Sequence, residues 1–244
     1  MRLLYAELLK IRTAPRTPLG LVLGLLVLVG LGSAATASGA DSSLFGSEAA
    51  LSDVITGAAF GVVFALILGV LIVTWEYRHG TITQTFLATP RRERVIGAKV
   101  ATAFLSGAIL SAAALAVALI VASFWISPDL DRGQWELVGR VLLASALWGV
   151  LGAGLGAVLQ SQVGAIVTAF VWFLVAEPLL GAAFDAFTGV AVGDYLPGAV
   201  IDRLHNVDAA QYPYGLWAGA LLAVAYAAGF AVLGIVSAVR RDVP

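Results

Sequence analysis

The stretch VITGAAFGVVFALILGVLIVTW, residues 54–75, decides the fold class because it contains no charged side chain. A helix rises about 1.5 Å per residue, so about 20 mostly apolar residues cross the hydrocarbon core of a bilayer. The charged segment EYRHG, residues 76–80, follows directly and marks where the chain leaves the lipid. The stretch therefore predicts a transmembrane helix.

Five further apolar stretches of similar length flank this one. The six spans are expected at residues 18–38, 54–75, 98–126, 137–159, 163–184 and 215–239. Of the whole chain, 60% is hydrophobic and 12% is charged, whereas an average soluble domain carries roughly 25% charged residues. A membrane β-barrel would show segments of about ten residues with alternating polarity. We therefore expect an all-α integral membrane protein with a single transmembrane domain over residues 1–244.

The residues before the first span, 1–17, carry an amphipathic pattern with several basic residues. Apolar residues recur there at helical spacing, and charged residues occupy the other side. The apolar positions are Leu4, Leu8 and Ile11, and the charged positions are Glu7 and Lys10. The pattern predicts an interfacial helix that lies on the membrane surface.

The distribution of Lys and Arg predicts the orientation in the membrane, because cytoplasmic connections carry an excess of both. With the N-terminus inside, 11 of the 14 are cytoplasmic: Arg2, Lys10, Arg12, Arg16, Arg78, Arg91, Arg92, Arg94, Lys99, Arg240 and Arg241. Ten of the 15 acidic residues fall outside. We expect a multi-pass protein of the cell membrane with both termini cytoplasmic.

The cytoplasmic segment 76–97 carries more pattern than a topology signal needs. Ile82 and Phe86, four residues apart, favour a short amphipathic helix over Thr81–Thr89. Gly80 would supply the turn into it, and Pro90 would end it, because the residue before proline avoids the helical region. A plain positive-inside loop explains the arginines but leaves this pattern unexplained.

Here the sequence resembles the ABC-2 type transporter permease family. The resemblance rests on the six spans, on Tyr195-Leu196-Pro197-Gly198, and on Glu76-Tyr77-Arg78-His79-Gly80-Thr81 followed by Leu87, Pro90, Arg92 and Lys99. It implies a type V exporter-like architecture, in which the permease works with a separate ATPase chain. It also implies that residues 1–17 form a connecting helix at the membrane surface and that segment 76–97 holds a coupling helix. The residues implied in ATPase coupling are Glu76, Arg78, Gly80, Thr81, Ile82, Phe86, Pro90 and Arg92.

The resemblance further implies that two permeases, identical or homologous, assemble with two ATPase subunits, with ATP and magnesium bound by the ATPase. The chain has no G-x-x-x-x-G-K-[ST] loop with which to cradle ATP phosphates itself. We expect no cofactor, no metal, no catalytic residue and no nucleic acid partner for this chain, and membrane lipid around it.

Glu177 is a carboxylate inside the fifth span, and such a group is a functional candidate by default. Pro178 behind it predicts a kink. With Tyr195 and Pro197 of the external segment 185–214, these residues are a possible external gate. The segment itself is either a re-entrant helical pair, as the resemblance implies, or an ordinary loop with an interfacial helix. Glu177 could equally be structural, reaching water or bonding backbone groups freed by Pro178.

The expected function is export of an amphiphilic or hydrophobic substrate, such as a drug, lipid or peptide. A secondary transporter or channel is the alternative, although it would typically need several ionisable groups inside the membrane. An intramembrane enzyme fits less well, because His79 and His205 fall on opposite sides and the chain has no cysteine.

Small residues at four-residue spacing predict close helix packing, mostly within the subunit. The pairs are Gly20 and Gly24, Gly152 and Gly156, and Gly215 and Gly219.

The predicted orientation can be tested with single cysteines, since the chain has none. Ser47→Cys and Asp208→Cys should react with an impermeant maleimide added to intact cells, and Thr83→Cys should react only after the membrane is opened. Labelling of Thr83→Cys from outside would refute the orientation.

Overall fold

The computed structural model describes residues 2–13, 16–39, 48–125, 129–205 and 213–240, and every regular element within them is helical. The long helices are α2 (Arg16–Gly39), α4 (Gly61–Arg78), α6 (Arg92–Ala122), α7 (Arg132–Leu159) and α11 (Leu216–Arg240). The shorter ones are α1 (Arg2–Thr13), α3 (Glu48–Ala58), α5 (Ile82–Ala88), α8 (Gln162–Val171), α9 (Glu177–Thr188) and α10 (Pro197–His205). Ser47, Ile126, Asp208 and the rest of 206–212 lie outside the described residues.

Six helical stretches are long and apolar enough to cross a membrane, which confirms the predicted fold class. They are Leu19–Ser38, Ala50–Arg78, Arg92–Ala122, Arg132–Leu159, Gln162–Thr188 and Leu216–Arg240. Two differ from uninterrupted spans. A turn at Ala59 and Phe60 separates α3 from α4, and a π-helical segment, η1 (Trp172–Ala176), joins α8 to α9.

Helix α6 begins at Arg92, before the span expected from residue 98. The expected span was placed by its apolar residues, so it left out the charged residues of this first turn. Charged residues can nevertheless form a helix. Glu93 lies in that turn, where an acidic side chain interacts favourably with the helix dipole.

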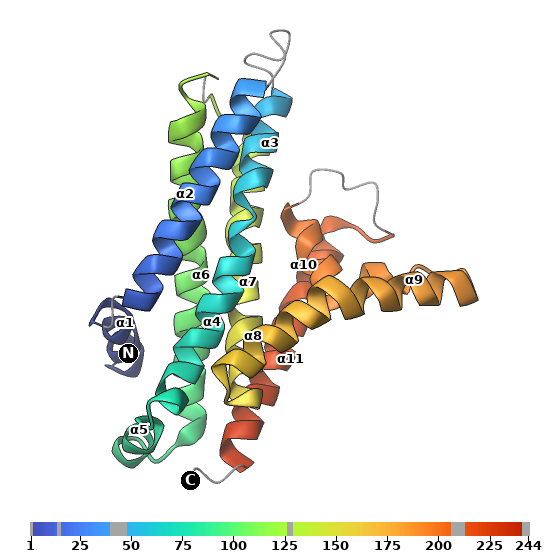
Figure 1. Cartoon of the computed structure of the whole chain (residues 1–244). Coiled ribbons are helices and arrows are strands. Elements are labelled where there is room, and N and C mark those ends of the chain that lie inside the picture. The colour runs from blue at the N-terminus through green and yellow to red at the C-terminus, as the bar shows by residue number, and fades with distance from the viewer. Residues whose placement is uncertain (1, 14–15, 40–47, 126–128, 206–212, 241–244) are drawn as a thin grey trace.

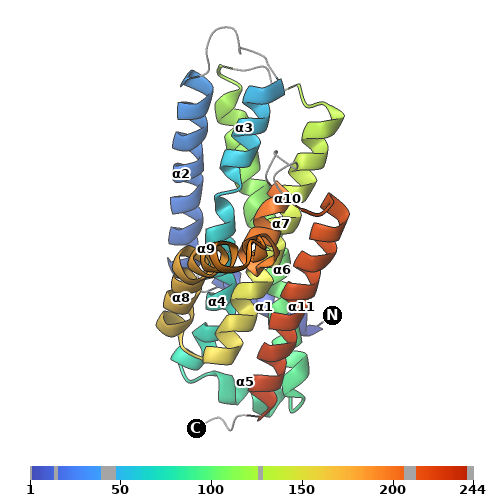
Figure 2. The ribbon, with the colours of Figure 1, turned by 90° about the vertical axis from the view of Figure 1, so that its right-hand side faces the viewer.

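Helix α7 lies at the centre of the bundle and packs against α4, α6 and α11 (Figures 1 and 2). These contacts bring backbone against backbone. A Cβ atom added to Gly152 would lie 2.1 Å from the carbonyl oxygen of Leu66 in α4, and one added to Gly154 would lie 2.5 Å from that of Phe230 in α11. A Cβ on Gly107 of α6 would lie 2.6 Å from the carbonyl oxygen of Ser145 in α7. Glycine is therefore required on α7 or on its neighbour at each interface.

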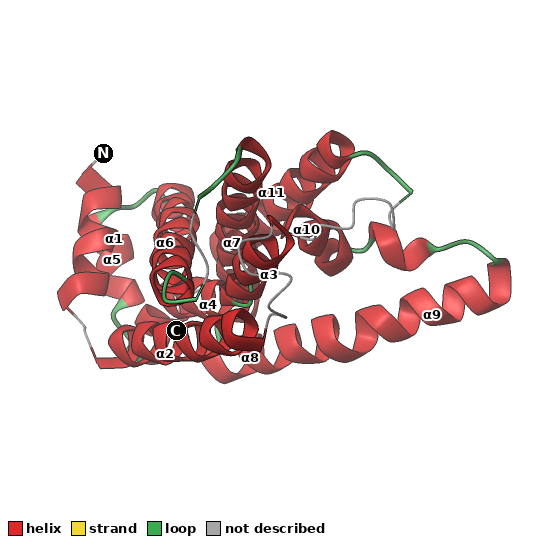
Figure 3. Cartoon of the chain, turned by 90° about the horizontal axis from the view of Figure 1, so that it is seen from above, coloured by secondary structure: helices red, strands yellow, loops and turns green. Residues whose placement is uncertain are grey.

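The fifth apolar stretch, α8–η1–α9, runs across the bundle and extends beyond it (Figures 1 and 3). The chain then turns back through a 3-10 segment, η2 (Val192–Tyr195), into α10, which packs against α7 and α11. Both termini lie toward the end of the bundle that carries α5 (Figure 1).

The close packing of α7 can be tested with one methyl group. Gly152→Ala should lower the midpoint of thermal unfolding in detergent, because α4 must move away, and overpacking of this kind costs about 1–3 kcal/mol. Gly139→Ala is the matched control on the same helix, since nothing lies within 4 Å of a Cβ placed there. Equal unfolding midpoints for the two variants would contradict the packing described.

Candidate functional site

Helix α5 is held by the turn that the sequence predicts. Gly80 has a φ of +66°, the left-handed conformation that glycine favours. The N–H of Thr81 donates to the carbonyl oxygen of Glu76 at 3.0 Å, and the N–H of Gly80 donates to that of Tyr77 at 3.3 Å. This pair of bonds is a Schellman motif, which ends α4, and α5 starts after three intervening residues. Thr89, before Pro90, is extended, so α5 ends where expected.

One side of α5 is buried and the other is exposed. Ile82 and Phe86 pack against Val95 of α6 in a small hydrophobic cluster. The guanidinium of Arg92 lies 5.1 Å from the centre of the Phe86 ring and donates to the carbonyl oxygen of Ala238 in α11 at 3.5 Å. Leu87, in contrast, is 78% exposed. The predicted amphipathic helix is thus confirmed, while its role in coupling stays a prediction.

A network of four alternating charges lies beside α5 and joins three helices. Lys10 of α1 donates to Glu7 at 2.7 Å and to Glu76 of α4 at 2.5 Å. Lys99 of α6 donates to Glu7 at 2.9 Å, and its Nζ lies 3.2 Å from Glu76 Oε1. The hydroxyl of Thr85 donates to Glu76 Oε2 at 3.1 Å, which connects α5 to the same group.

Three of the four charges are buried and each has partners of opposite sign, whereas the side chain of Lys10 is 47% exposed. Lys99 is 1% exposed, and Glu7 and Glu76 are 4% and 5% exposed. Lys99 also donates to the carbonyl oxygen of Ile72 at 3.3 Å, so its ammonium group has three oxygen neighbours. Burial alone would lower the pKa of Lys10, but hydrogen bonds and charge interactions with Glu7 and Glu76 outweigh it and raise that pKa.

The network borders a cavity of about 570 Å³ between α1, α4, α5 and α6. Its lining combines Lys10, Lys99, Glu7 and Glu76 with apolar residues of α4 and threonines of α5. The cavity leaves space between α5 and α1 on the side where α5 contacts the charges.

Arg78 binds a partner outside the charge network. Its guanidinium donates to the side-chain oxygen of Gln162 at 3.0 Å, at the start of α8. Nearby, the side-chain amide of Gln160 donates to the hydroxyl of Tyr77 at 3.4 Å. The end of α4 is therefore tied to the α7–α8 turn as well as to α1 and α6.

Sequence reasoning missed Glu7 and Lys99 as members of this site. Glu7 was expected on the polar side of an interfacial helix, but it is buried, while Tyr5 and Leu9 are exposed. Lys99 was counted as a cytoplasmic basic residue and as part of the family resemblance, but not among the coupling residues. Its position, immediately after Ala98 where the third span was expected to start, was the available clue, because an ammonium at such a place needs a counter-charge.

Glu177 lies where α9 meets the start of α10, and it is 5% exposed. Its Oε1 accepts a hydrogen bond from the N–H of Ala199 at 3.0 Å. The first N–H groups of a helix lack partners within the helix and attract anions, so Glu177 caps α10 from a distant part of the chain. A backbone donor of the external segment therefore partners this carboxylate. No hydrogen bond joins Tyr195 to Glu177 among the described residues.

The other residues of the possible gate have separate structural roles. Pro178 lies in the first turn of α9, directly after η1. Its missing N–H and bulky ring disfavour a continuous α-helix through the preceding turn, which accounts for the π-helical segment there. Pro197 begins α10 and is buried. The carbonyl oxygen of Tyr195 accepts from the hydroxyl of Tyr226 in α11 at 2.7 Å, which holds η2 against the bundle.

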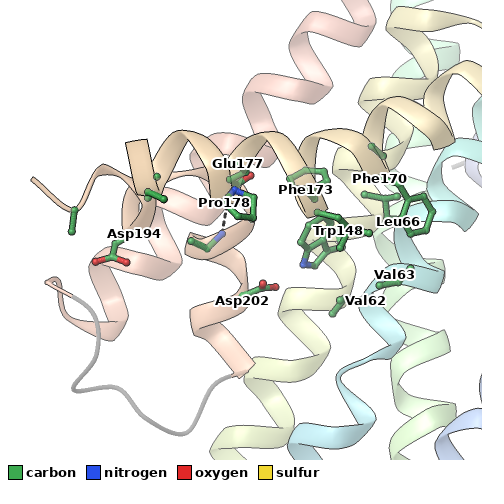
Figure 4. Close-up of a pocket in the computed structure, with 18 of the residues that line it drawn as sticks. Val62, Val63, Leu66, Trp148, Phe170, Phe173, Glu177, Pro178, Asp194 and Asp202 are labelled. Atoms are coloured by element: carbon green, nitrogen blue, oxygen red, sulfur yellow. Dashed lines mark hydrogen bonds between the residues drawn. The ribbon is translucent and has the colours of Figure 1, made fainter. Parts of the chain in front are cut away.

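A second cavity, of about 520 Å³, lies beside Glu177 between α4, α7, the α8–α9 stretch and α10. Figure 4 shows Glu177 and Asp202 on one side of it and Trp148, Phe173 and Phe170 on the other. Trp148 and Phe173 stack edge to face with ring centres 4.5 Å apart. Asp202 was counted only among the external acidic residues in the sequence.

Comparison with known proteins places these features in a family. The model of the ABC-2 family transporter protein family matches residues 3–177, which include α1, the segment 76–97, the charge network and Glu177. Helices α10 and α11 follow the matched region. No curated protein matches the chain in a sequence search. The match covers well over half of the chain, which therefore belongs to the ABC-2 transporter family, as a membrane-spanning permease subunit that associates with an ABC ATPase.

Proposed function

We propose that this permease exports an amphiphilic or hydrophobic substrate, driven by ATP hydrolysis on a partner ATPase that docks at the α5 end of the bundle. The observation that carries the proposal is the charge network, because it connects α5 to α1, α4 and α6 at one point. The ATPase would bind ATP and magnesium. This end of the bundle, with both termini, would face the cytoplasm of the cell.

Helix α5 has one exposed side that could bind a partner and one side that packs on the rest of the permease. Thr83, Gln84 and Leu87 are exposed and would contact the ATPase, while Ile82 and Phe86 are packed against α6. A displacement of α5 would act on Glu76 through Thr85 and on α4 through the short Gly80 turn. Since Lys10 and Lys99 both contact Glu76, the same displacement would reach α1 and α6.

Two permeases and two ATPases would form the complete transporter. Helix α2 offers one surface for the second permease, because Leu19, Leu23 and Val27 are exposed on it. Gly20 and Gly24 of the same helix have nothing within 4 Å of an added Cβ. Small residues without neighbours permit close approach of another helix.

The external gate of the transport pathway would lie where α9 meets α10, away from the α5 end of the bundle. Glu177, Pro178, Tyr195 and Pro197 are the proposed gate residues. The bond from Ala199 to Glu177 supports this role, because it joins two short helices and would part if α9 moved.

Co-purification tests the proposed function. The tagged full-length chain, extracted from its native membranes in mild detergent, should retain a nucleotide-binding protein, and the complex should hydrolyse ATP and accumulate substrate in proteoliposomes. Substrate transport by the permease alone, without nucleotide, would refute the proposal in favour of a secondary transporter.

The coupling role of the network can be tested with Glu76→Gln. This change leaves two ammonium groups against one carboxylate, and breaking a buried ion pair in this way costs about 3–5 kcal/mol. Transport should fall strongly while the protein still inserts into the membrane. Glu136→Gln is the matched control, since Glu136 is exposed near the opposite end of α7.

A second variant separates coupling from stability. Thr85→Val removes one hydrogen bond to Glu76, worth about 0.5–1.5 kcal/mol, and keeps all four charges. The complex should assemble normally and transport less substrate per ATP hydrolysed. Wild-type transport per ATP in both Glu76→Gln and Thr85→Val would remove the network from the coupling path.

A further inference from the structure

The cavity beside Glu177 has two unlike sides. Carboxylates line it from α9, η2 and α10, whereas aromatic and aliphatic side chains line it from α4, α7, α8 and η1 (Figure 4). The acidic residues are Glu177, Asp185, Asp194 and Asp202. No Lys or Arg is among the described residues that line the cavity.

One of these carboxylates is buried and only partly satisfied. Glu177 Oε1 accepts from Ala199, but Oε2 makes no hydrogen bond within the described part of the chain. A buried oxygen atom without a donor is costly, because it has lost its hydration without replacement. Glu177 Oε2 could therefore accept a hydrogen bond from a ligand or lie beside a positive charge of the ligand.

Asp202 contributes a second negative charge to this side of the cavity, and the histidine beside it does not neutralise that charge. Desolvation, followed by the negative charge of Glu177, raises the pKa of Asp202 to about 6, so Asp202 is still mostly ionised at pH 7. His205 Nε2 lies 3.5 Å from Asp202. Desolvation, followed by the charge of Arg140, lowers the pKa of His205 to about 4, so His205 is neutral at pH 7 and does not compensate Asp202.

The facing side suits the apolar part of a ligand and also favours positive charge. Trp148 and Phe173 present a T-shaped aromatic pair to the cavity, and Phe170, Leu66 and Val63 extend it. Aromatic rings attract organic cations through their negative faces. The volume of about 520 Å³ lies within the range of roughly 300–1,000 Å³ common for small-molecule sites.

We propose that this cavity binds an organic cation with a hydrophobic body, its charge near Asp202 and Glu177 and its body against Trp148 and Phe173. The inference rests on the proposed function for its transport role, and it narrows the substrate class to cationic amphiphiles. Binding itself requires neither the ATPase nor nucleotide.

Asp202 is the residue to change, because Glu177 also caps α10 and its loss could unfold that helix. The purified full-length permease in detergent is titrated with tetraphenylphosphonium and with tetraphenylborate, which share shape and hydrophobicity and differ in sign of charge. Tetraphenylphosphonium should bind saturably and more tightly. Asp202→Asn should weaken that binding by about tenfold through loss of one nearby counter-charge. Asp129→Asn, at an exposed position before α7, is the matched control and should bind like wild type.

A thermal unfolding scan of each variant confirms that the fold is intact. Equal binding of the two ions, or unchanged tetraphenylphosphonium binding in a folded Asp202→Asn protein, overturns the inference and leaves the ATP-driven function untouched. Conversely, saturable tetraphenylphosphonium binding by a permease that transports substrate without nucleotide would refute the proposed function and leave the cavity assigned.

The titration also identifies the source of the cation. It is repeated in phosphatidylglycerol vesicles with and without phosphatidylcholine. Competition by phosphatidylcholine assigns the site to a choline headgroup, and absence of competition assigns it to a soluble cation.

Discussion

The backbone contact of α7 with α4 and α6 is the constraint on which the rest of the structure depends. Helices that touch through glycine have no side chain between them that could adjust its rotamer, so their relative position is fixed. Helix α4 supplies Glu76 and α6 supplies Lys99, and these two side chains must approach within 3.2 Å. The same α7 places Trp148, next to Gly149, in the wall of the second cavity. One rigid helix thus positions both candidate sites.

The number of spans and the short helix α5 could be predicted from the sequence because each depends on local features. A long apolar run predicts a membrane-spanning helix whatever surrounds it in the fold. Helix α5 is likewise specified within eleven residues, by Gly80, Ile82, Phe86 and Pro90. The charge network could not be predicted in this way. Amphipathic patterning places Glu7 on the polar side of α1. It does not predict a contact with Lys99, because that residue lies in a helix ninety-two residues later in the chain.

The fifth apolar stretch illustrates the same limit. Pro178 correctly indicated an interruption, and the π-helical segment precedes it. The direction in which α9 leaves the bundle depends on contacts with η2 and α10, which lie later in the chain. Asp202 was therefore read as one more external acid, although its helix brings it beside Glu177. A carboxylate inside a span was a sound signal for that region, but it identified one of the two residues.

The four side chains beside α5 sum to zero charge, since two ammonium groups face two carboxylates. A membrane potential does about 2.3 kcal/mol of work per 100 mV on each net elementary charge that crosses the full field. If α1, α4 and α6 shift together along the membrane normal, this group carries no net charge with it. The electric field across the membrane therefore neither assists nor opposes that movement at the network, and under the proposed function the energy for it would come from the ATPase docked at α5.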